Sequence, residues 1–168
     1  KNWLDLCKQK STEFLHKESW LKDACKNKKM ILFLFGTFER MSSYKEDIDG
    51  MKLLIQTIEN FKLVKNAFII IKPHANANIK KLDNVLRENN LTNFKIINMH
   101  VSVLSNYCNY AVCNYMSFAL VDAWFRGVTT IEYTSYNSKI LKETNNKSLY
   151  PEFVDYFLDV TDNKKFLK

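Results

Sequence analysis

The chain has 168 residues, of which 46% are hydrophobic and 26% are charged, a balance typical of one globular domain of ordinary size. No apolar run reaches the roughly 20 residues that a membrane-spanning helix needs, and charges throughout the opening stretch "KNWLDLCKQKSTEFLHKESW" exclude a secretory signal peptide. The net charge of +7 favours an anionic partner such as a nucleotide or an anionic lipid surface, whereas scattered lysines without a recognition motif argue against nucleic acid.

Helices and strands are predicted to alternate along the chain. Residues 1–29 carry apolar side chains at helical spacing, including a second short helix at Ser19–Cys25 with Ser19 as its cap. Continuous apolar runs then predict strands that are buried on both faces of a parallel sheet. These strands are Met30–Gly36, Asn66–His74, Phe94–Met99, Tyr110–Asn114 and Thr129–Tyr133. Helices are expected between them, at residues 51–61, 76–90 and 118–126, and residues 154–160 form either a sixth strand or a short edge segment.

This alternation predicts an α/β fold with a doubly wound, mainly parallel sheet of about five or six strands and helices on both faces. We expect residues 30–168 to form this Rossmann-like domain. Residues 1–29 are expected to form a helical N-terminal segment or an interdomain linker.

The cysteines show no spacing that indicates chemistry. None of them forms a CxxC pair, and their separations fit no zinc site, so we expect reduced thiols, as in a cytosolic protein. The four cysteines are Cys7, Cys25, Cys108 and Cys113.

The candidate binding residues are those that directly follow each predicted strand, because open parallel sheets bind ligands at the carboxyl ends of their strands. These residues are mostly polar, and two of the three histidines are among them. In chain order they are Gly36 and Thr37, His74 and Asn76, Met99 and His100, Asn114 and Ser117, and Tyr133 and Thr134.

Two polar residues stand out around the predicted helix at residues 118–126. Ser117 is a natural N-cap, where free backbone N–H groups suit a phosphate, although a cap without a ligand fits the same pattern. Asp122 lies mid-helix among large apolar residues, so we expect a buried carboxylate. It either binds a pair of ribose hydroxyls or forms a structural bond to a backbone N–H or a lysine. Gly127 is predicted to end the helix.

The ends of the first two strands carry further candidates. Gly36 and Thr37 allow a phosphate to approach the backbone closely, or they form a plain turn. His74 either donates a hydrogen bond to a phosphate or is a loop histidine. Lys72 or Arg40 either adds positive charge there or is a solvated surface residue.

Four segments occur in the order seen in the C-terminal half of GT-B glycosyltransferases: "FLFGTFE", "IIIKPHANANIKKL", "INMHVSVLSNYCNYAVCNYMSFALVDAWFRGVTTIEY" and "EFVDYFLDV". From residue 30 onward the chain therefore resembles the donor-binding domain of these enzymes, particularly the transferases of bacterial capsules and other surface polysaccharides. It departs from their motifs at Ala75, where proline is usual, and at Asp122, where glutamate is usual. The resemblance implies that the chain is the donor half of a longer enzyme.

The resemblance also implies a role for each candidate residue. The implied contacts are Gly36 and Thr37 at the diphosphate, His74, Ser117 and the backbone of Phe118 at the departing phosphate, Asp122 at the ribose, and Met99 and His100 at the nucleobase. Of these residues, His74 would be the catalytic one, because it stabilises the negative charge that develops on the leaving phosphate.

The implied function is transfer of a sugar from a nucleotide-activated donor to a glycan acceptor during the biosynthesis of bacterial surface polysaccharide. We expect no cofactor and no metal requirement. Backbone N–H groups at residues 117–118, together with His74, would stabilise the negative charge on the departing phosphate. We expect a cytoplasmic protein, held at the inner face of the membrane by contact with anionic lipid. Three alternatives remain open: a UDP-sugar epimerase-like domain, a polyol-phosphate transferase domain, and a non-catalytic flavodoxin-like binding module.

Overall fold

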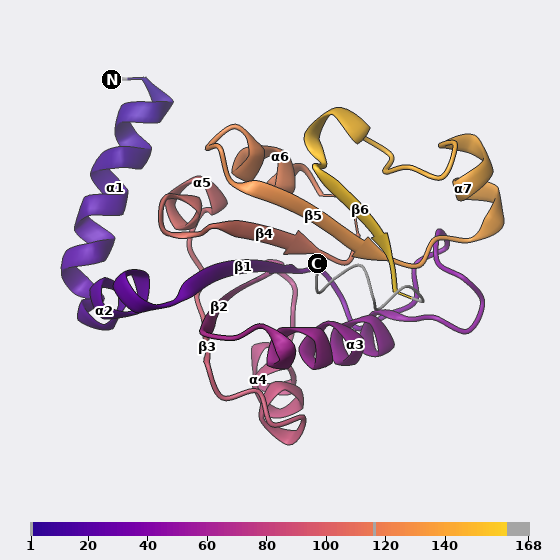
Figure 1. The fold of residues 1–168 in the computed structure, drawn as a ribbon, viewed down its shortest axis with the longest axis horizontal. Coiled ribbons are helices and arrows are strands. Elements are labelled where there is room, and N and C mark those ends of the chain that lie inside the picture. Colours follow the sequence, from indigo (N-terminus) through magenta and orange to yellow (C-terminus); the bar gives the residue numbers. More distant parts are fainter. Residues whose placement is uncertain (1, 116, 161–168) are drawn as a thin grey trace.

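The computed structural model describes residues 2–115 and 117–160, so residues 161–168 of the predicted domain lie outside the described part. Its centre is a six-stranded sheet in which every neighbouring pair of strands is parallel (Figure 1). The strands are β1 (Lys29–Phe35), β2 (Ala67–Pro73), β3 (Phe94–Ile96), β4 (Tyr110–Cys113), β5 (Thr129–Thr134) and β6 (Tyr156–Asp159). The predicted α/β class is confirmed, and the stretch that sequence left open forms the sixth strand.

The order of the strands across the sheet is β3-β2-β1-β4-β5-β6. The chain first winds outward from β1 to β3 and then returns to the other side of β1 to add β4, β5 and β6. In a doubly wound sheet this reversal creates a crevice beside the first strand, at the carboxyl ends of the strands. The fold therefore directs attention to the ends of β1 and its two neighbours, β2 and β4.

Helices and short turns connect the strands. They are α1 (Trp3–Lys17), α2 (Ser19–Asn27), α3 (Gly50–Leu63), α4 (Ile79–Glu88), α5 (Val101–Leu104), η1 (Ser105–Tyr107), α6 (Phe118–Trp124), α7 (Ser138–Glu143) and η2 (Pro151–Phe153). Sequence patterning did not predict α7, because none of its described side chains is buried and it therefore shows no apolar period. The predicted cap of α2 was wrong: Ser19 is the first helical residue, and Glu18 precedes it without a side-chain capping bond.

The two faces of the sheet bury separate apolar cores, and alternate residues of β1 divide between them. Phe33 packs with α3 and α4 in the first core, whereas Leu32 packs with α1, α2, α5 and α6 in the second. Figure 1 shows α3 and α4 on one side of the sheet and α5 and α6 on the other. Both faces of the central strands are thus covered, which explains why these strands are continuous apolar runs in the sequence.

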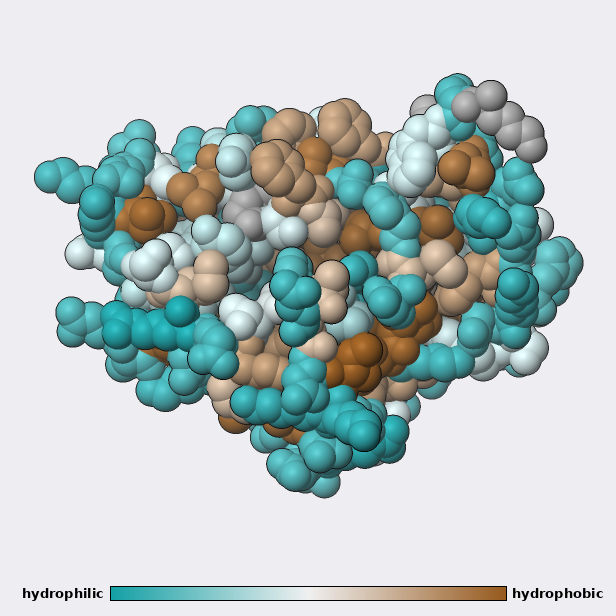
Figure 2. Space-filling view, turned by 180° about the vertical axis from the view of Figure 1, so that it is seen from behind, coloured by the Kyte–Doolittle hydropathy of each residue, from teal (hydrophilic) through white to brown (hydrophobic). Residues whose placement is uncertain are grey.

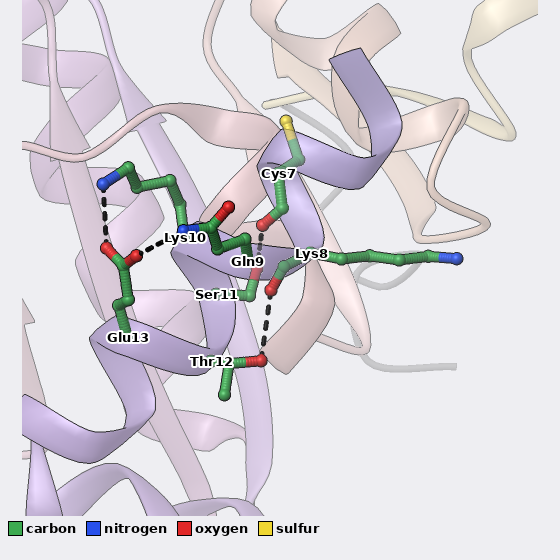
Figure 3. Close-up of polar contacts among 7 residues, drawn as sticks. All are labelled: Cys7, Lys8, Gln9, Lys10, Ser11, Thr12 and Glu13. Carbon is green, nitrogen blue, oxygen red and sulfur yellow. Dashed lines mark hydrogen bonds and ion pairs between the residues drawn. The ribbon is translucent and has the colours of Figure 1, made fainter. Parts of the chain in front are cut away.

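The N-terminal helices contribute to the second core. Phe14 of α1 and Leu21 of α2 are buried there. Figure 3 shows part of α1, in which the Ser11 hydroxyl donates to the carbonyl of Cys7 at 2.9 Å. The same hydroxyl reaches the carbonyl of Val103 in α5 at 3.4 Å, so α1 is tied to the helices that cover the sheet. Lys10 and Glu13, also drawn in Figure 3, form an exposed ion pair of 2.8 Å.

Two observations concern the outer surface of the molecule. No helix among the described residues is long and apolar enough to cross a membrane. Figure 2 shows light-brown side chains along the upper edge of that view. Four exposed aromatic residues lie in or next to α6 and just before η2: Phe118, Trp124, Phe125 and Tyr150.

Candidate functional site

A cavity of about 650 Å³ lies at the carboxyl ends of β1, β2 and β4, where the reversal in strand order places the crevice. Its walls combine backbone from the strand ends with aromatic, hydroxyl and basic side chains. The lining residues are Leu34, Phe35, Gly36, Thr37, Met41, Tyr44, Lys72, Pro73, His74, Asn114, Tyr115, Ser117, Phe118, Ala119, Leu149 and Tyr150. A cavity of this size is in the range of small-molecule sites.

The structure brings together part of the set of residues that sequence singled out. Gly36, Thr37, His74, Ser117 and Phe118 all line this cavity, although they come from three separate strand ends. Lys72 and Asn114 line it as well. The candidates that are not among its lining residues are Arg40, Asn76, Met99, His100, Asp122, Tyr133 and Thr134.

His74 is fixed by hydrogen bonds on both its backbone and its ring. Its backbone N–H donates to the carbonyl of Phe35 at 2.8 Å, which extends the β1–β2 pairing into the loop. Its ring atom Nδ1 accepts a bond from the backbone N–H of Asn76 at 3.3 Å. A ring nitrogen that accepts cannot carry the proton, so this arrangement leaves the N–H on Nε2. The exposed imidazole of His74 thus offers one donor at the rim of the cavity.

Lys72 supplies positive charge to the same side of the cavity. Its ammonium group donates to the carbonyl of Pro73 at 2.8 Å. Within the described part of the chain, no carboxylate forms an ion pair with Lys72. None of the described residues that line the cavity is acidic. Lys72 therefore makes this wall positively charged and His74 adds an N–H donor, whereas Arg40 is exposed and is not among the lining residues.

Ser117 caps α6, as predicted. Its Oγ accepts a bond from the N–H of Ala119 at 3.2 Å, and its hydroxyl proton remains able to donate to a ligand. The helix spans Phe118–Trp124, two residues less than predicted, and Gly127 follows it with a φ of 73°. Because so short a helix has little dipole, Ser117 contributes to the cavity through its side chain rather than through the helix N-terminus.

The N-terminus of α3 is closed by the protein's own backbone. The N–H groups of Gly50 and Met51 donate to the carbonyls of Glu39 and Phe38, at 3.0 and 3.1 Å. The carboxylate of Asp49 accepts from the N–H of Lys52 at 2.8 Å. The first strand–helix junction of the sheet therefore has no free phosphate-binding amides at these positions. One residue separates Asp47 from Asp49, and in the structure the side chain of Asp49 serves as the cap of α3.

The expectation of a buried Asp122 was wrong. Its side chain is half-exposed, and it has no hydrogen bond or ion pair with any other described residue. The reason is that α6 buries its opposite side, with Leu120 and Ala123 in the core. The buried acid of this region is Glu132 on β5, which is 0% exposed and accepts a bond from the hydroxyl of Tyr136.

Met99 and His100 lie on the side of the molecule where α1 meets α5. Nδ1 of His100 accepts a bond from the N–H of Ser102 at 3.2 Å and thereby caps α5. The His100 ring also packs edge-on against the indole of Trp3, with 5.0 Å between the ring centres. Met99 packs against the second core. Both side chains thus have structural contacts away from the cavity.

Sequence reasoning missed two tyrosines of the cavity wall, Tyr44 and Tyr150. Tyr44 comes from the polar loop after β1, and its hydroxyl donates to the carbonyl of Asn114 at 3.3 Å. Burial raises the pKa of Tyr44, and the nearby Cys113 and Glu132 add to this effect. Tyr150 comes from the loop before η2, about which the sequence offered no prediction. A tyrosine within a polar stretch carries no periodic signal, so only the folded chain reveals where it lies.

The described residues give no indication of a metal centre or a disulfide. In residues 2–115 and 117–160, no group of three His, Cys, Asp or Glu side chains is arranged to hold a metal ion. All four cysteines are free, and burial raises the pKa of Cys108 and Cys113. The chemistry that the cavity offers is therefore that of Lys72, His74 and the hydroxyl and aromatic groups.

Comparison with known proteins gives a likeness of fold. No family model matches the sequence, and no curated protein matches it. Among solved structures, one described as the glycotransferase of kitacinnamycin is similar with a TM-score of 0.46 and 10% identity, covering 80% of this chain and 31% of that chain. The chain thus spans less than a third of the length of that protein. At this level of identity the likeness describes the fold alone.

Proposed function

We propose that this chain is the donor-binding domain of a glycosyltransferase that uses a nucleotide-activated sugar. The observation that carries the proposal is the cationic wall of the cavity at the ends of β1, β2 and β4. There, Lys72 and His74 face a space whose described lining contains no carboxylate. An anionic group such as a diphosphate would gain charge-assisted hydrogen bonds from both residues without meeting a like charge.

The same residues suit the chemistry of glycosyl transfer. When the bond from the sugar to the phosphate breaks, negative charge develops on the departing phosphate oxygen. The ammonium group of Lys72 and the Nε2–H of His74 would stabilise that charge in place, with the hydroxyls of Thr37 and Ser117 as further donors. In this proposal the acceptor is a glycan of a bacterial surface polysaccharide, and its binding site lies in a part of the enzyme beyond this domain.

The flavodoxin-like alternative has less support. A flavin phosphate in that class of protein would bind backbone N–H groups where the first strand meets the first helix. Here those N–H groups, of Gly50 and Met51, already donate to the carbonyls of the loop after β1. A UDP-sugar epimerase and a polyol-phosphate transferase would bind an activated donor in the same way, so analysis of the products of the full-length enzyme would distinguish them.

The proposal is tested by thermal unfolding of the 168-residue chain with CMP, CDP, UDP, GDP, ADP and FMN. A ligand at about 100 times its dissociation constant adds about 2.7 kcal/mol to the free energy of unfolding, which raises Tm by about 5–10 °C in a domain of this size. We expect one nucleotide to raise Tm. Binding of FMN in preference to nucleotides, or binding of none of these compounds, would contradict the proposal.

Two substitutions locate the binding site. Lys72→Met and His74→Ala should each weaken binding of that nucleotide about 10- to 100-fold, because each removes a hydrogen bond to a charged group. Lys65→Met is the matched control, since Lys65 is an exposed lysine that does not line the cavity. Equal affinity of all three variants and the parent would show that the nucleotide binds elsewhere.

A further inference from the structure

The cavity has two chemically different ends. Lys72 lies at the carboxyl end of β2 and His74 directly follows that strand, on one side of β1, whereas Phe118 comes after β4 on the other side. Neighbouring strands lie about 4.8 Å apart, so the carboxyl ends of β2 and β4 are separated by about 10 Å. A ligand that extends across the end of β1 would therefore have its charged part at one end and meet aromatic side chains at the other.

The aromatic end is formed by Phe118 and Tyr150. Their ring centres lie 5.7 Å apart, and the ring planes are tilted by 43°. Both residues line the cavity, yet Phe118 is 75% exposed and Tyr150 is 40% exposed. Two exposed aromatic rings at the mouth of a cavity gain little from burial in the protein itself. Their exposed faces remain available to a planar ring of a ligand.

Both aromatic residues are held by the backbone around them. Phe118 is the first residue of α6, directly after the cap Ser117. The backbone N–H of Tyr150 donates to the hydroxyl oxygen of Ser148 at 3.2 Å, and its carbonyl accepts from the N–H of Phe153 at 3.1 Å. Because the backbone at both positions is fixed, only the side-chain torsions of the two rings would remain to be ordered around a ligand.

We infer that Phe118 and Tyr150 form a stacking platform for the heteroaromatic ring of a nucleotide whose phosphates are held by Lys72 and His74. This inference rests on the proposed function and adds the orientation of the ligand. It assigns the base to the β4–α6 side of the cavity, away from Met99 and His100, whose side chains have structural contacts elsewhere. Stacking accepts any base, because every base has a π face, so the platform would contribute affinity more than selectivity.

The test compares ligands with and without the ring. Dissociation constants of the parent chain are measured by calorimetry for each nucleotide of the thermal panel, for inorganic phosphate and for inorganic pyrophosphate. Phe118→Ala and Tyr150→Ala should weaken nucleotide binding about 5- to 100-fold, the range seen when an aromatic residue that stacks on a base is truncated. Binding of phosphate and pyrophosphate should change less than about twofold, since neither probe has a ring. Phe118→Trp and Tyr150→Phe keep a ring and should keep the affinity for nucleotides.

Phe125→Ala is the matched control. Phe125 directly follows α6 and is 69% exposed, but it does not line the cavity. If the parent binds nucleotides and the Phe118 and Tyr150 variants bind them equally well, the stacking platform is overturned while the proposed function stands. The platform is also overturned if these variants weaken pyrophosphate as much as nucleotides. Failure of the parent to bind any nucleotide overturns the proposed function and the platform together.

Discussion

Two strand–helix junctions flank the centre of this sheet, and the protein uses them in opposite ways. At the β1–α3 junction, residues 36–49 form a long loop whose carbonyls accept the N–H groups of Gly50 and Met51. At the β4–α6 junction, four residues separate the strand from the helix, and the described ones among them, Asn114, Tyr115 and Ser117, all line the cavity. The first junction is filled by the chain itself, whereas the second opens onto the site.

This difference teaches that a strand end in a doubly wound sheet is available to a ligand only where the protein leaves its donors unused. Carbonyl groups of the loop after β1 accept hydrogen bonds from the first N–H groups of α3, and the loop then packs over the ends of the central strands. It contacts the segment that follows β5 through hydrogen bonds from the N–H of Lys45 to the carbonyl of Ser135, 3.0 Å, and from the N–H of Asn137 to the carbonyl of Ser43, 2.8 Å. The loop thus forms part of the cavity wall instead of cradling a phosphate.

The largest expected effect is that of adding an atom to the tightly packed first junction. A Cβ atom at Gly50 would lie 2.0 Å from the carbonyl oxygen of Thr37, so Gly50→Ala forces the loop and α3 apart. We expect a loss of about 3 kcal/mol in the free energy of unfolding, measured by urea denaturation. Gly36→Ala is the control, because a Cβ there meets no atom within 4 Å. Equal stability of the two variants would mean that the junction is not packed as described.

The next effect concerns the link between the two junctions. The hydroxyl of Tyr44, in the loop after β1, donates to the carbonyl of Asn114 after β4, and burial raises the pKa of this hydroxyl above its ordinary value near 10. The unfolded chain therefore loses this proton at lower pH than the folded chain does. Below about pH 10 the protonated hydroxyl makes its full contribution to the free energy of unfolding. Above that pH the free energy of unfolding falls by about 1.4 kcal/mol for each pH unit.

This pH dependence is measured by urea denaturation between pH 8 and pH 11, for the parent and for Tyr44→Phe. The parent should lose more stability than the variant over this range, because only the parent has the Tyr44 proton to lose. Parallel curves for the two proteins would show that the hydroxyl of Tyr44 is not protected from water.

The smallest effect is expected at the open junction itself. Ser117→Ala removes the oxygen that accepts the N–H of Ala119, and it should lower the free energy of unfolding by about 0.5–1 kcal/mol. Ser117→Asp restores a cap acceptor and should recover that stability, while its negative charge in the cavity that Lys72 and His74 also line should weaken anion binding. Stability of Ser117→Ala equal to that of the parent would mean that this cap contributes nothing to folding.

Most of the sheet could be predicted from the sequence. The runs that became β1 and β2 are continuously apolar because helices cover both faces of these strands, and this pattern depends on local sequence alone. The cap at Ser117 and the end of α6 before Gly127, with its φ of 73°, are local for the same reason. The rule that ligands bind at strand ends then identified Gly36, His74 and Ser117, which do line the cavity.

The remaining features were decided by packing between distant parts of the chain. Asp122 was expected to be buried because of its neighbours in sequence, but burial depends on which side of a short helix faces the sheet, and that side carries Leu120 and Ala123. Glu132 is the acid that became buried, because β5 lies inside the sheet between β4 and β6.

The sequence by itself determined the order of the strands and of the helices with an apolar face, since apolar periodicity and capping act within a few residues. Tertiary structure decided what surrounds the cavity. Tyr44 and Tyr150 lie far apart in sequence and carry no periodic signal, yet the loop after β1 and the loop before η2 bring both of them to the end of β4. Their positions depend on how the loops pack over the strand ends, and that packing exists only once the sheet has formed.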